Sequence, residues 1–317
     1  RLEEVQRLCS AATIMRHGKV VDSCAPREET AGSLASKMVG AEIEGVRHKK
    51  TGETGDVMMA LNRLSMGTSH PFAVALKDIS LEVRQGEVVC IAGIAGNGQG
   101  ELFEAISGEA RQQTADQVTI LGNPAGHRSI SERRNLGASF VPEERLGHGA
   151  VPGMTLTDNM LLARHASDAD TFRKMGRLQI IASTAIQAAT QRVNSAMDVR
   201  KSAENPPAAA LSGGNLQKFI VGRELDRKPK FILVNQPTWG VDAGAAAHIR
   251  QSLLDLAASG SAVLVISQDL DEIFEIATSI AVMADGRMTP PEPAQDMTRE
   301  RIGLLMAGSG NEQGQVA

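Results

Sequence analysis

A glycine-rich segment directly after an apolar run has the composition of a phosphate-binding loop. It follows EVVCIA and consists of Gly93, Ile94, Ala95, Gly96, Asn97, Gly98, Gln99, Gly100 and Glu101, the last of which opens the helix-forming stretch ELFEAIS. Glycines let successive backbone N–H groups converge on a phosphate, and the N-terminus of the following helix adds partial positive charge. Gly93 and Gly98 fit the pattern GxxxxGK[ST], but Gln99 stands at the lysine position and Gly100 at the hydroxyl position. We therefore expect a backbone cradle that lacks the lysine for the β/γ-phosphates and the hydroxyl for magnesium.

Two other interpretations of this loop rest on its glycines alone. A dinucleotide fingerprint would require an acidic residue about 20 positions further on, at the end of the next strand. That strand ends in Leu121, Gly122 and Asn123, without a carboxylate. A tight turn between a strand and a helix would also use glycine. The loop needs neighbouring motifs before it indicates nucleotide binding.

Such motifs come later in the chain. A helix-entry segment, LSGGNLQ, contains Leu211, Ser212, Gly213, Gly214, Asn215 and Gln217. The apolar run 231–234 then leads into NQPTWGVD, which holds Asn235, Gln236 and Asp242. In this order, the segments resemble the nucleotide-binding domain of ATP-binding cassette (ABC) transporters over residues 57–308. LSGGN resembles the family signature, and NQPTWGVD stands where the Walker B strand, the catalytic glutamate and the D-loop would be.

The resemblance implies an α/β fold of the P-loop NTPase ABC cassette type. It implies a mixed, mostly parallel sheet, an antiparallel β part and a helical subdomain at about residues 143–226. It also places Glu143 at the Q-loop glutamine and Gln268 at the switch histidine. Asn235 then replaces the magnesium aspartate, and Gln236 replaces the catalytic glutamate. Because a neutral amide cannot accept the proton of the attacking water, we expect this half alone to be a poor ATPase.

The intact signature has a separate function in this family, in which two cassettes face each other head to tail. The resemblance implies that Ser212, Gly213 and Gly214 contact the γ-phosphate of ATP held by a first cassette of the same chain, as a second set of anion donors. The expected cofactors are ATP and Mg²⁺, mainly at the site that the first cassette completes. Adenine stacking by Phe72 is an open alternative to a turn role, since the chain has no tyrosine.

The elements that position these motifs follow from hydrophobic patterning. Apolar runs bounded by turns predict buried strands at 87–93, 117–121, 138–141, 231–235 and 262–267. Helices are expected at 99–107, 172–197, 215–225, 243–257 and 298–306. The alternation indicates a mostly parallel sheet covered by helices. Residues 150–226 show no convincing strand, which favours a helical insertion.

An internal repeat predicts the domain organisation. Residues 2–19 align without gaps with residues 270–287, an offset of 268 (270 minus 2), with Met15 matching Met283 and Gly18 matching Gly286. A spacing this long indicates duplicated domains, because solenoid repeats are shorter. We expect 1–40 to be the end of a first cassette, 41–56 a linker, 57–308 a second cassette and 309–317 a flexible tail. On this interpretation, the chain starting at Arg1 is truncated inside a longer one.

Composition limits the remaining function classes. The 317 residues carry a net charge of −4, which argues against a nucleic-acid binder with a broad basic surface. No apolar run approaches the ~20 residues that cross a bilayer. Three cysteines without CxxC spacing, and scattered histidines, give no metal site. Taken with the resemblance to ABC transporters, these features imply a peripheral subunit on the cytoplasmic face of the cell membrane.

Within the family, the lysine-less loop, LSGGN and the QPT segment resemble ATP-binding proteins of bacterial simple-sugar and nucleoside importers. The partners implied are integral-membrane permease subunits, gripped near residues 140–159, and indirectly an extracytoplasmic substrate-binding protein. Two alternatives stay open: a soluble ABC-type ATPase not coupled to transport, and a noncatalytic nucleotide sensor. Intact carboxylates in the cassettes would have favoured the first of these.

Overall fold

The computed structural model describes residues 2–16, 19–30, 33–34, 37, 55–68, 71–168, 172–174 and 180–307. The expected tail 309–317 and most of the expected linker 41–56 lie outside the described residues. No helix in the described ranges combines the length and apolarity that crossing a bilayer requires.

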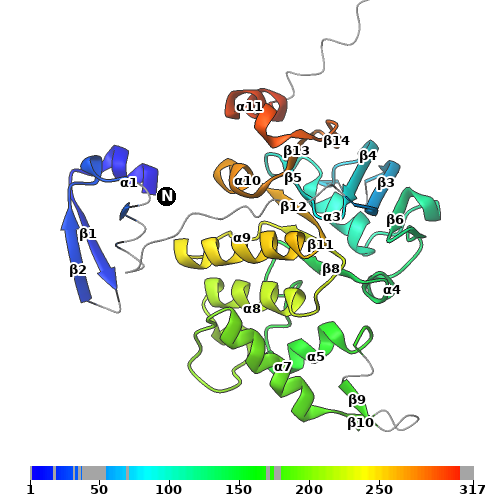
Figure 1. The fold of residues 1–317 in the computed structure, drawn as a ribbon, viewed down its shortest axis with the longest axis horizontal. Helices are drawn as coiled ribbons and strands as arrows, with labels where there is room; N and C mark the ends of the chain where they lie inside the picture. Colours follow the sequence, from blue (N-terminus) through cyan, green and yellow to red (C-terminus); the bar gives the residue numbers. More distant parts are fainter. Residues whose placement is uncertain are drawn as a thin grey trace, which may run out of the picture.

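The main sheet of the cassette is mostly parallel (Figure 1). Its strand order is β14-β13-β5-β12-β11-β8, and β15 also pairs with β13. Neighbours from β13 to β8 run parallel, whereas β14 and β15 pair antiparallel with β13. The strands are β5 (Val88–Ala92), β8 (Ala138–Val141), β11 (Phe231–Asn235), β12 (Ala262–Ser267), β13 (Ser279–Ala284), β14 (Arg287–Met288) and β15 (Glu292–Pro293).

An antiparallel sheet packs on one face of the main sheet. Its order is β4-β3-β6-β7, with β3 (Val57–Met66), β4 (Leu76–Arg84), β6 (Val118–Ile120) and β7 (Asn123–Pro124). Between the two sheets lies a core that includes Val89 and Ile91 of β5, and also takes in helix α3 (Gln99–Ser107). This arrangement confirms the α/β cassette expected from the sequence, with its mixed sheet and antiparallel part.

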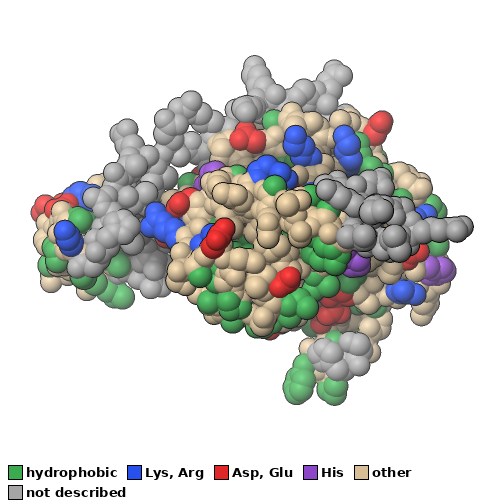
Figure 2. Space-filling model, turned by 90° about the horizontal axis from the view of Figure 1, so that it is seen from below, with side chains coloured by type: hydrophobic (Ala, Val, Ile, Leu, Met, Phe, Trp, Pro, Cys, Tyr) green, Lys and Arg blue, Asp and Glu red, His purple; other side chains and the backbone are tan. Residues whose placement is uncertain are grey.

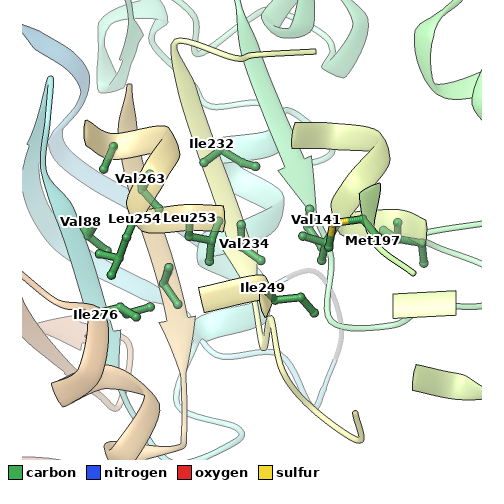
Figure 3. Close-up of a cluster of buried hydrophobic side chains, with 14 of the residues drawn as sticks. Val88, Val141, Met197, Ile232, Val234, Ile249, Leu253, Leu254, Val263 and Ile276 are labelled. Atoms are coloured by element: carbon green, nitrogen blue, oxygen red, sulfur yellow. The ribbon is translucent and has the colours of Figure 1, made fainter. Parts of the chain in front are cut away.

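Helices cover the opposite face. Side chains alternate between faces along a strand, so Val88 and Cys90 of β5 point into a second core (Figure 3). In that core, Ile232 and Val263 pack with Ile249 of helix α9. The helices here are α5 (Leu156–Arg164), α7 (Ser183–Ala196), α8 (Gly213–Leu225), α9 (Ala243–Ala258), α10 (Leu270–Ile276) and α11 (Arg299–Met306), with α4 (Ile130–Asn135) beside β8.

One expected helix is wrong at its start. Residues 172–197 were predicted as a single helix, but α7 begins only at Ser183. Before it, β9 (Arg173–Lys174) and β10 (Ile180–Ile181) form a short antiparallel pair. The amide N–H of Ala182 donates to the carbonyl of Phe172 at 2.8 Å, next to this pair, and Phe172 is fully buried. Two adjacent β-branched isoleucines favour a strand, so the expectation of no strand within 150–226 is also corrected.

The N-terminal unit repeats the end of the cassette element by element. Adding 268 to the bounds of α1 (Leu2–Leu8) gives those of α10, and adding 268 to the 3₁₀ turn Pro26–Glu28 gives the turn Ala294–Asp296. Strands β1 (Ala12–Arg16) and β2 (Lys19–Cys24) pair in the register that β13 uses with β14 and β15. Met15 lies opposite Val20 just as Met283 lies opposite Met288.

Candidate functional site

The glycine loop joins β5 to α3, as its sequence predicts. Gly98 has a φ of 109°, in the left-handed region, and an added Cβ there would lie 2.7 Å from the Cε atom of Met283. Glycine is therefore required both by the backbone conformation and by the close packing of β13. Ala95 and Gly96 lie exposed at the tip of the loop.

Gln99 closes this loop from inside. Its Nε2 donates to the carbonyl of Ile94 at 2.9 Å, and its Oε1 accepts from the backbone N–H of Asn97 at 3.0 Å. The side chain is only 7% exposed and fills the space against Gly93. A loop N–H that could have served a phosphate is thus already satisfied by the protein. Gln99, at the lysine position, therefore satisfies hydrogen-bonding groups of the loop from within the protein.

Two neighbours of Gln99 fix the loop to the rest of the fold. Asn97 accepts the backbone N–H of Asp285 on its Oδ1 at 2.8 Å, which ties the loop to the turn after β13. The carboxylate of Glu101 accepts the backbone N–H of Val74 at 2.8 Å. Gly100 is exposed at the start of α3 and has no hydroxyl to offer a cation. Phe72, the candidate for adenine stacking, is 92% exposed.

The residues expected at the Walker B positions come together at the end of β11. Asn235 is 3% exposed, and its Oδ1 atom has no hydrogen-bond partner in the described part of the chain. Gln236 has a φ of 53°, an unusual conformation for a non-glycine residue that is typical of functional sites. Gln268 is exposed beyond β12. With neutral amides here and glycine at position 100, these residues do not fit a magnesium ion.

A cavity of about 650 Å³ joins most of the predicted motifs. Its lining includes Gly100 of the loop, Glu143, Asn235, and Leu211 and Gly213 of the helix-entry segment. Partial desolvation raises the pKa of the Glu143 carboxyl. Asp242 is not among the lining residues: its Oδ1 accepts the backbone N–H of Ala245 at 2.9 Å, capping α9. Among the described residues, no cluster of histidine, cysteine or carboxylate side chains could hold a metal ion.

The helix-entry segment leaves the N-terminus of α8 open. Ser212 occupies the N-cap position, but its side chain makes no capping hydrogen bond to the helix backbone. Instead, Asn215 Nδ2 donates to the Ser212 hydroxyl oxygen at 2.9 Å, so the hydroxyl proton is directed elsewhere. Gly214 follows in the first turn, and Gln217 is 1% exposed, donating to the carbonyl of Pro237 at 2.9 Å. The first-turn N–H groups of α8 are therefore open to an anion.

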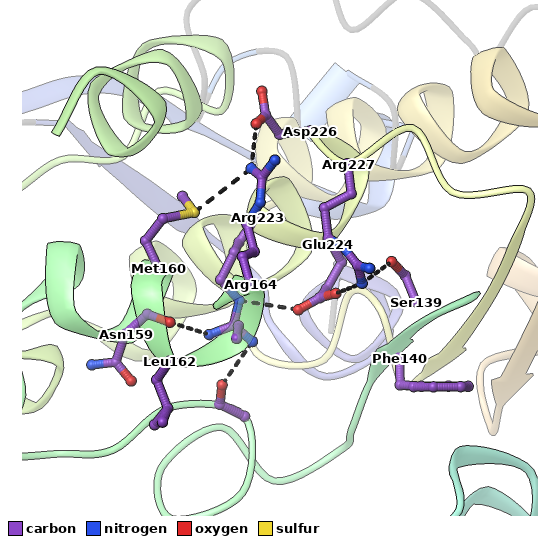
Figure 4. A network of polar contacts seen from close by, with 12 residues as sticks. Ser139, Phe140, Asn159, Met160, Leu162, Arg164, Arg223, Glu224, Asp226 and Arg227 are labelled. Atoms are coloured by element: carbon purple, nitrogen blue, oxygen red, sulfur yellow. Dashed lines mark hydrogen bonds and ion pairs between the residues drawn. The ribbon is translucent and has the colours of Figure 1, made fainter. Parts of the chain in front are cut away.

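Three parts of the site were not predicted from the sequence. Glu272 is 2% exposed and accepts hydrogen bonds from the hydroxyls of Thr238 and Ser267, both at 2.7 Å, while burial raises its pKa. Arg145 contacts the helix-entry segment. Glu224 lies in an ionic cluster in the last turn of α8 (Figure 4). Each has at least one partner between 34 and 94 residues away in the chain, which local spacing does not relate.

The ionic cluster ties α8 to α4 across the helical layer. Glu224 is fully buried, and its carboxylate lies 3.0 Å from Arg223 and 3.5 Å from Arg227 (Figure 4). The same carboxylate lies 2.7 Å from Arg134. Burial alone would raise the pKa of Glu224, but the three guanidinium groups outweigh it and lower the pKa to about 2. The carboxylate therefore stays ionised in the folded protein and neutralises part of the arginine charge.

A histidine–carboxylate pair lies between this cavity and a second, smaller one. His148 Nε2 lies 2.9 Å from Glu109 Oε1, and its ring meets Phe103 edge-on. The hydrogen bond to Glu109 raises the pKa of His148 above 6.5, and the carboxylates of Glu144 and Glu104 act in the same direction. Burial opposes ionisation of Glu109, but its contact with His148 outweighs this and lowers its pKa below 4.5.

We expect the stabilising effect of this pair to depend on pH. The contribution of His148 to the stability of the folded protein is fully present below pH 6.5 and is lost as the pH rises through the raised pKa of His148. The contribution of Glu109 to the stability of the folded protein is fully present above pH 4.5 and is lost as the pH falls through the lowered pKa of Glu109. The melting-temperature difference between wild type and His148→Gln should therefore be largest between pH 4.5 and 6.5. The control is His127→Gln, because the wild-type His127 ring contacts the carbonyl of Gln113 and not a carboxylate. Its melting-temperature difference from wild type should have no maximum in this pH range.

Comparison with known proteins decides the family. The family model described as "ABC transporter" matches residues 76–239. The chain belongs to the ABC transporter family. The matched range contains the glycine loop at 93–101 and the LSGGN segment, and it ends at Trp239, in the segment after β11. The cofactor of such cassettes is ATP with Mg²⁺.

Curated relatives of this ABC cassette are ATP-binding proteins of importers. The guanosine import ATP-binding protein NupO of Bacillus subtilis is 32% identical over 306 residues, covering 96% of this chain and 59% of its own length. The glucose import ATP-binding protein TsgD13 of Haloferax volcanii is 34% identical, covering 98% and 56%. The nucleoside import ATP-binding protein NupA of Lactococcus lactis is 33% identical, covering 97% and 60%. The chain therefore spans between 56% and 60% of the length of these relatives.

Solved ABC cassettes share the fold. A dimeric post-hydrolysis structure of the cassette MJ0796 with ADP and phosphate aligns with a TM-score of 0.63 and 21% identity, covering 76% of this chain and 100% of that one. A nucleotide-free cassette aligns with a TM-score of 0.61 and 20% identity, covering 80% and 96%. At this identity, the likeness establishes the fold of the cassette and nothing finer.

Proposed function

We propose that this chain holds the second, catalytically degenerate cassette of a tandem ATP-binding protein that energises an importer for simple sugars or nucleosides. In this proposal, residues 1–40 end a first cassette, 41–56 form a linker, 57–308 form the second cassette with its helical subdomain at about 143–226, and 309–317 form a tail. The names of the relatives support the transport role, because they are import ATP-binding proteins for guanosine, glucose and nucleosides.

The exposed apolar side chains of the N-terminal unit support the tandem arrangement. Ile276 of α10 and Met283 of β13 are fully buried in the cassette. Their counterparts Leu8 and Met15 are 80% and 61% exposed. Figure 2 shows hydrophobic side chains on the surface of the N-terminal unit, at the left of the view. Since buried apolar area is the main source of folding stability, a first cassette that covers these side chains explains their residue types.

The difference between the closed loop and the open signature is the main support for different roles of the two cassettes. Gln99 fills the Walker A loop, whereas the N-terminus of α8 at the signature is open. Asn235, Gln236 and Gln268 also lack the groups that a cassette uses to hold magnesium and activate water. We infer that the first cassette holds Mg²⁺ and ATP, and that Ser212, Gly213 and Gly214 of this one contact the γ-phosphate in trans.

The second cavity suits a permease contact. It measures about 290 Å³ and is lined by residues that include Phe140, Pro142, Val151 and Leu162. Phe140, Pro142 and Val151 lie within the segment 140–159, in which the coupling helix of a permease is expected. The proposed subunit lies at the cytoplasmic face of the membrane, bound to permease subunits that a substrate-binding protein supplies from the other side. The net charge of −4 agrees with the expectation of no nucleic-acid partner.

Nucleotide binding by the purified chain tests the proposal. We expect Mg–ATP analogues to bind with a Kd above about 1 mM, a binding free energy weaker than about 4 kcal/mol, and no turnover. Gln99→Lys opens the loop and returns a cation, so it should tighten binding at least about tenfold, or about 1.4 kcal/mol. Isothermal titration calorimetry and phosphate release measure both. Gln251→Lys, on the exposed face of α9, is the matched control and should change neither.

Other outcomes separate the alternatives. Tight, magnesium-dependent binding with turnover by this chain would contradict the degenerate site. Tight binding without turnover would favour a nucleotide sensor. A full-length protein that hydrolyses ATP without responding to permease-containing membranes would favour a soluble ATPase. An upstream reading frame with no GxxxxGK[ST] loop within about 100–200 residues would contradict the tandem arrangement.

A further inference from the structure

Arg145 joins three motifs that are separate in the sequence. It comes two residues after Glu143, in the loop between β8 and α5. Its Nε donates to Gln217 Oε1 of the signature helix at 3.0 Å, and its Nη2 donates to the carbonyl of Trp239 in the D-loop. The guanidinium also lies against the backbone of the signature, since a Cβ added at Gly213 would be 2.7 Å from Nη1.

Arg145 makes its contacts through hydrogen bonds to neutral acceptors and not through ion pairs. Desolvation lowers the pKa of Arg145, and no carboxylate contributes to this shift. A partly buried guanidinium without a counter-ion is costly unless its hydrogen bonds are well placed. Its planar fork presents two separate nitrogens, Nε and Nη2, to acceptors from different segments, whereas a lysine offers a single nitrogen. The arginine therefore fixes the distance between the signature helix and the D-loop.

The same loop faces the proposed permease groove on its other side. The carbonyl of Arg145 accepts the backbone N–H of Ala150 at 2.7 Å, and that of Glu144 accepts the N–H of Gly149 at 2.9 Å. These two hydrogen bonds make the segment 144–150 a tight, self-bonded turn. His148, Gly149 and Ala150 of this turn line the cavity of about 290 Å³. A displacement imposed in the groove must therefore carry Arg145 with it.

We infer that Arg145 is a positioning residue that links occupancy of the groove to the placement of the signature and the D-loop. This inference rests on the proposed function, because it concerns how a bound permease affects the ATP held by the first cassette. Arg145 acts through Gln217, Gly213 and Trp239. When the turn 144–150 moves, the guanidinium shifts the N-terminus of α8 and the D-loop together.

The fluorescence of this chain tests the link directly. The protein has one tryptophan and no tyrosine, so its intrinsic emission reports Trp239 alone. We expect the steady-state anisotropy of Trp239 to fall in Arg145→Met and in Arg145→Lys, because methionine has no donor and the single nitrogen of lysine cannot take the places of both Nε and Nη2. Arg128→Met should leave it unchanged, since that guanidinium donates to the carbonyl of Pro124, elsewhere in the fold. An unchanged anisotropy in Arg145→Met would overturn the inference.

Coupling is tested in the full-length protein with its permease. Arg145→Met should lower the ratio of permease-stimulated to basal ATP hydrolysis about tenfold, within the usual range of coupling between sites. Arg145→Lys should lower this ratio to the same extent. A wild-type ratio in Arg145→Lys would show that the positive charge suffices without the guanidinium geometry, and it would overturn the inference. If Arg145→Met fails to fold, Gln217→Met removes the acceptor from the other side, with the same readouts. A wild-type protein without permease stimulation would reject the proposed function, while the anisotropy would still test Arg145.

Discussion

Gly213→Asp in the full-length protein is expected to lower the kcat for ATP hydrolysis by about a hundredfold to a thousandfold, the usual effect of losing a transition-state anion donor. The first turn of α8 is open, so the substituted carboxylate would lie where the γ-phosphate of the facing cassette is proposed to bind. It would also draw the guanidinium of Arg145, since an added Cβ lies 2.7 Å from Nη1. Phosphate release by the purified full-length protein measures the loss.

The same substitution should leave the fold intact, which makes the result interpretable. A carboxylate in the first turn of a helix interacts favourably with the helix dipole, and the melting temperature should therefore not fall. Gly303→Asp is the matched control, because an added Cβ in α11 meets nothing within 4 Å. Activity above about a tenth of wild type in Gly213→Asp would count against the signature acting in trans.

Glu224→Ala is expected to destabilise the cassette by about 3–5 kcal/mol, the usual cost of removing one partner from a buried ionic cluster. The substitution leaves Arg134, Arg223 and Arg227 without the carboxylate that lies between them. Glu224→Gln should be nearly as damaging, since an amide accepts hydrogen bonds but neutralises no charge. Denaturant titration followed by circular dichroism measures the free energy of unfolding.

The pH dependence gives the sign of the Glu224 effect. Its pKa is lowered from 4.5 to about 2, so its contribution is present above pH 4.5 and is lost as pH falls toward 2. Wild type and Glu224→Gln should therefore converge in stability in acid. Glu82→Ala removes an exposed ion pair with Arg84 and should cost no more than about 1 kcal/mol. Equal losses of unfolding free energy in Glu82→Ala and Glu224→Ala would show that the buried cluster stabilises the fold no more than an exposed ion pair does.

The sequence predicted the strands of the main sheet well because their signal is local. The bounds of β8, β11 and β12 agree with the predicted ranges, since strands buried on both faces are continuous apolar runs. Helix α3 was also placed correctly, at the end of the glycine loop. The start of α7 was wrong because the β9–β10 pairing competes with helix formation, and pairing depends on a second segment rather than on propensity.

The site was predictable in its motifs and not in its contacts. The glycine loop and the LSGGN segment could be found by spacing, and one cavity contains residues of both. The hydrogen bonds of Arg145 reach partners 72 and 94 residues away, and the ion pair of Glu224 with Arg134 spans 90 residues. Only the folded chain brings such residues together. The inward turn of Gln99 was equally hidden, because a residue type does not specify a rotamer.

The inward turn of Gln99 also bears on the energetics of transport. Two facing cassettes with two working loops can hydrolyse two ATP molecules in each cycle, but a loop closed by its own glutamine leaves one. The proposed importer would then couple each solute molecule to the free energy of a single hydrolysis. That single hydrolysis would set the steepest solute gradient the importer could maintain across the membrane.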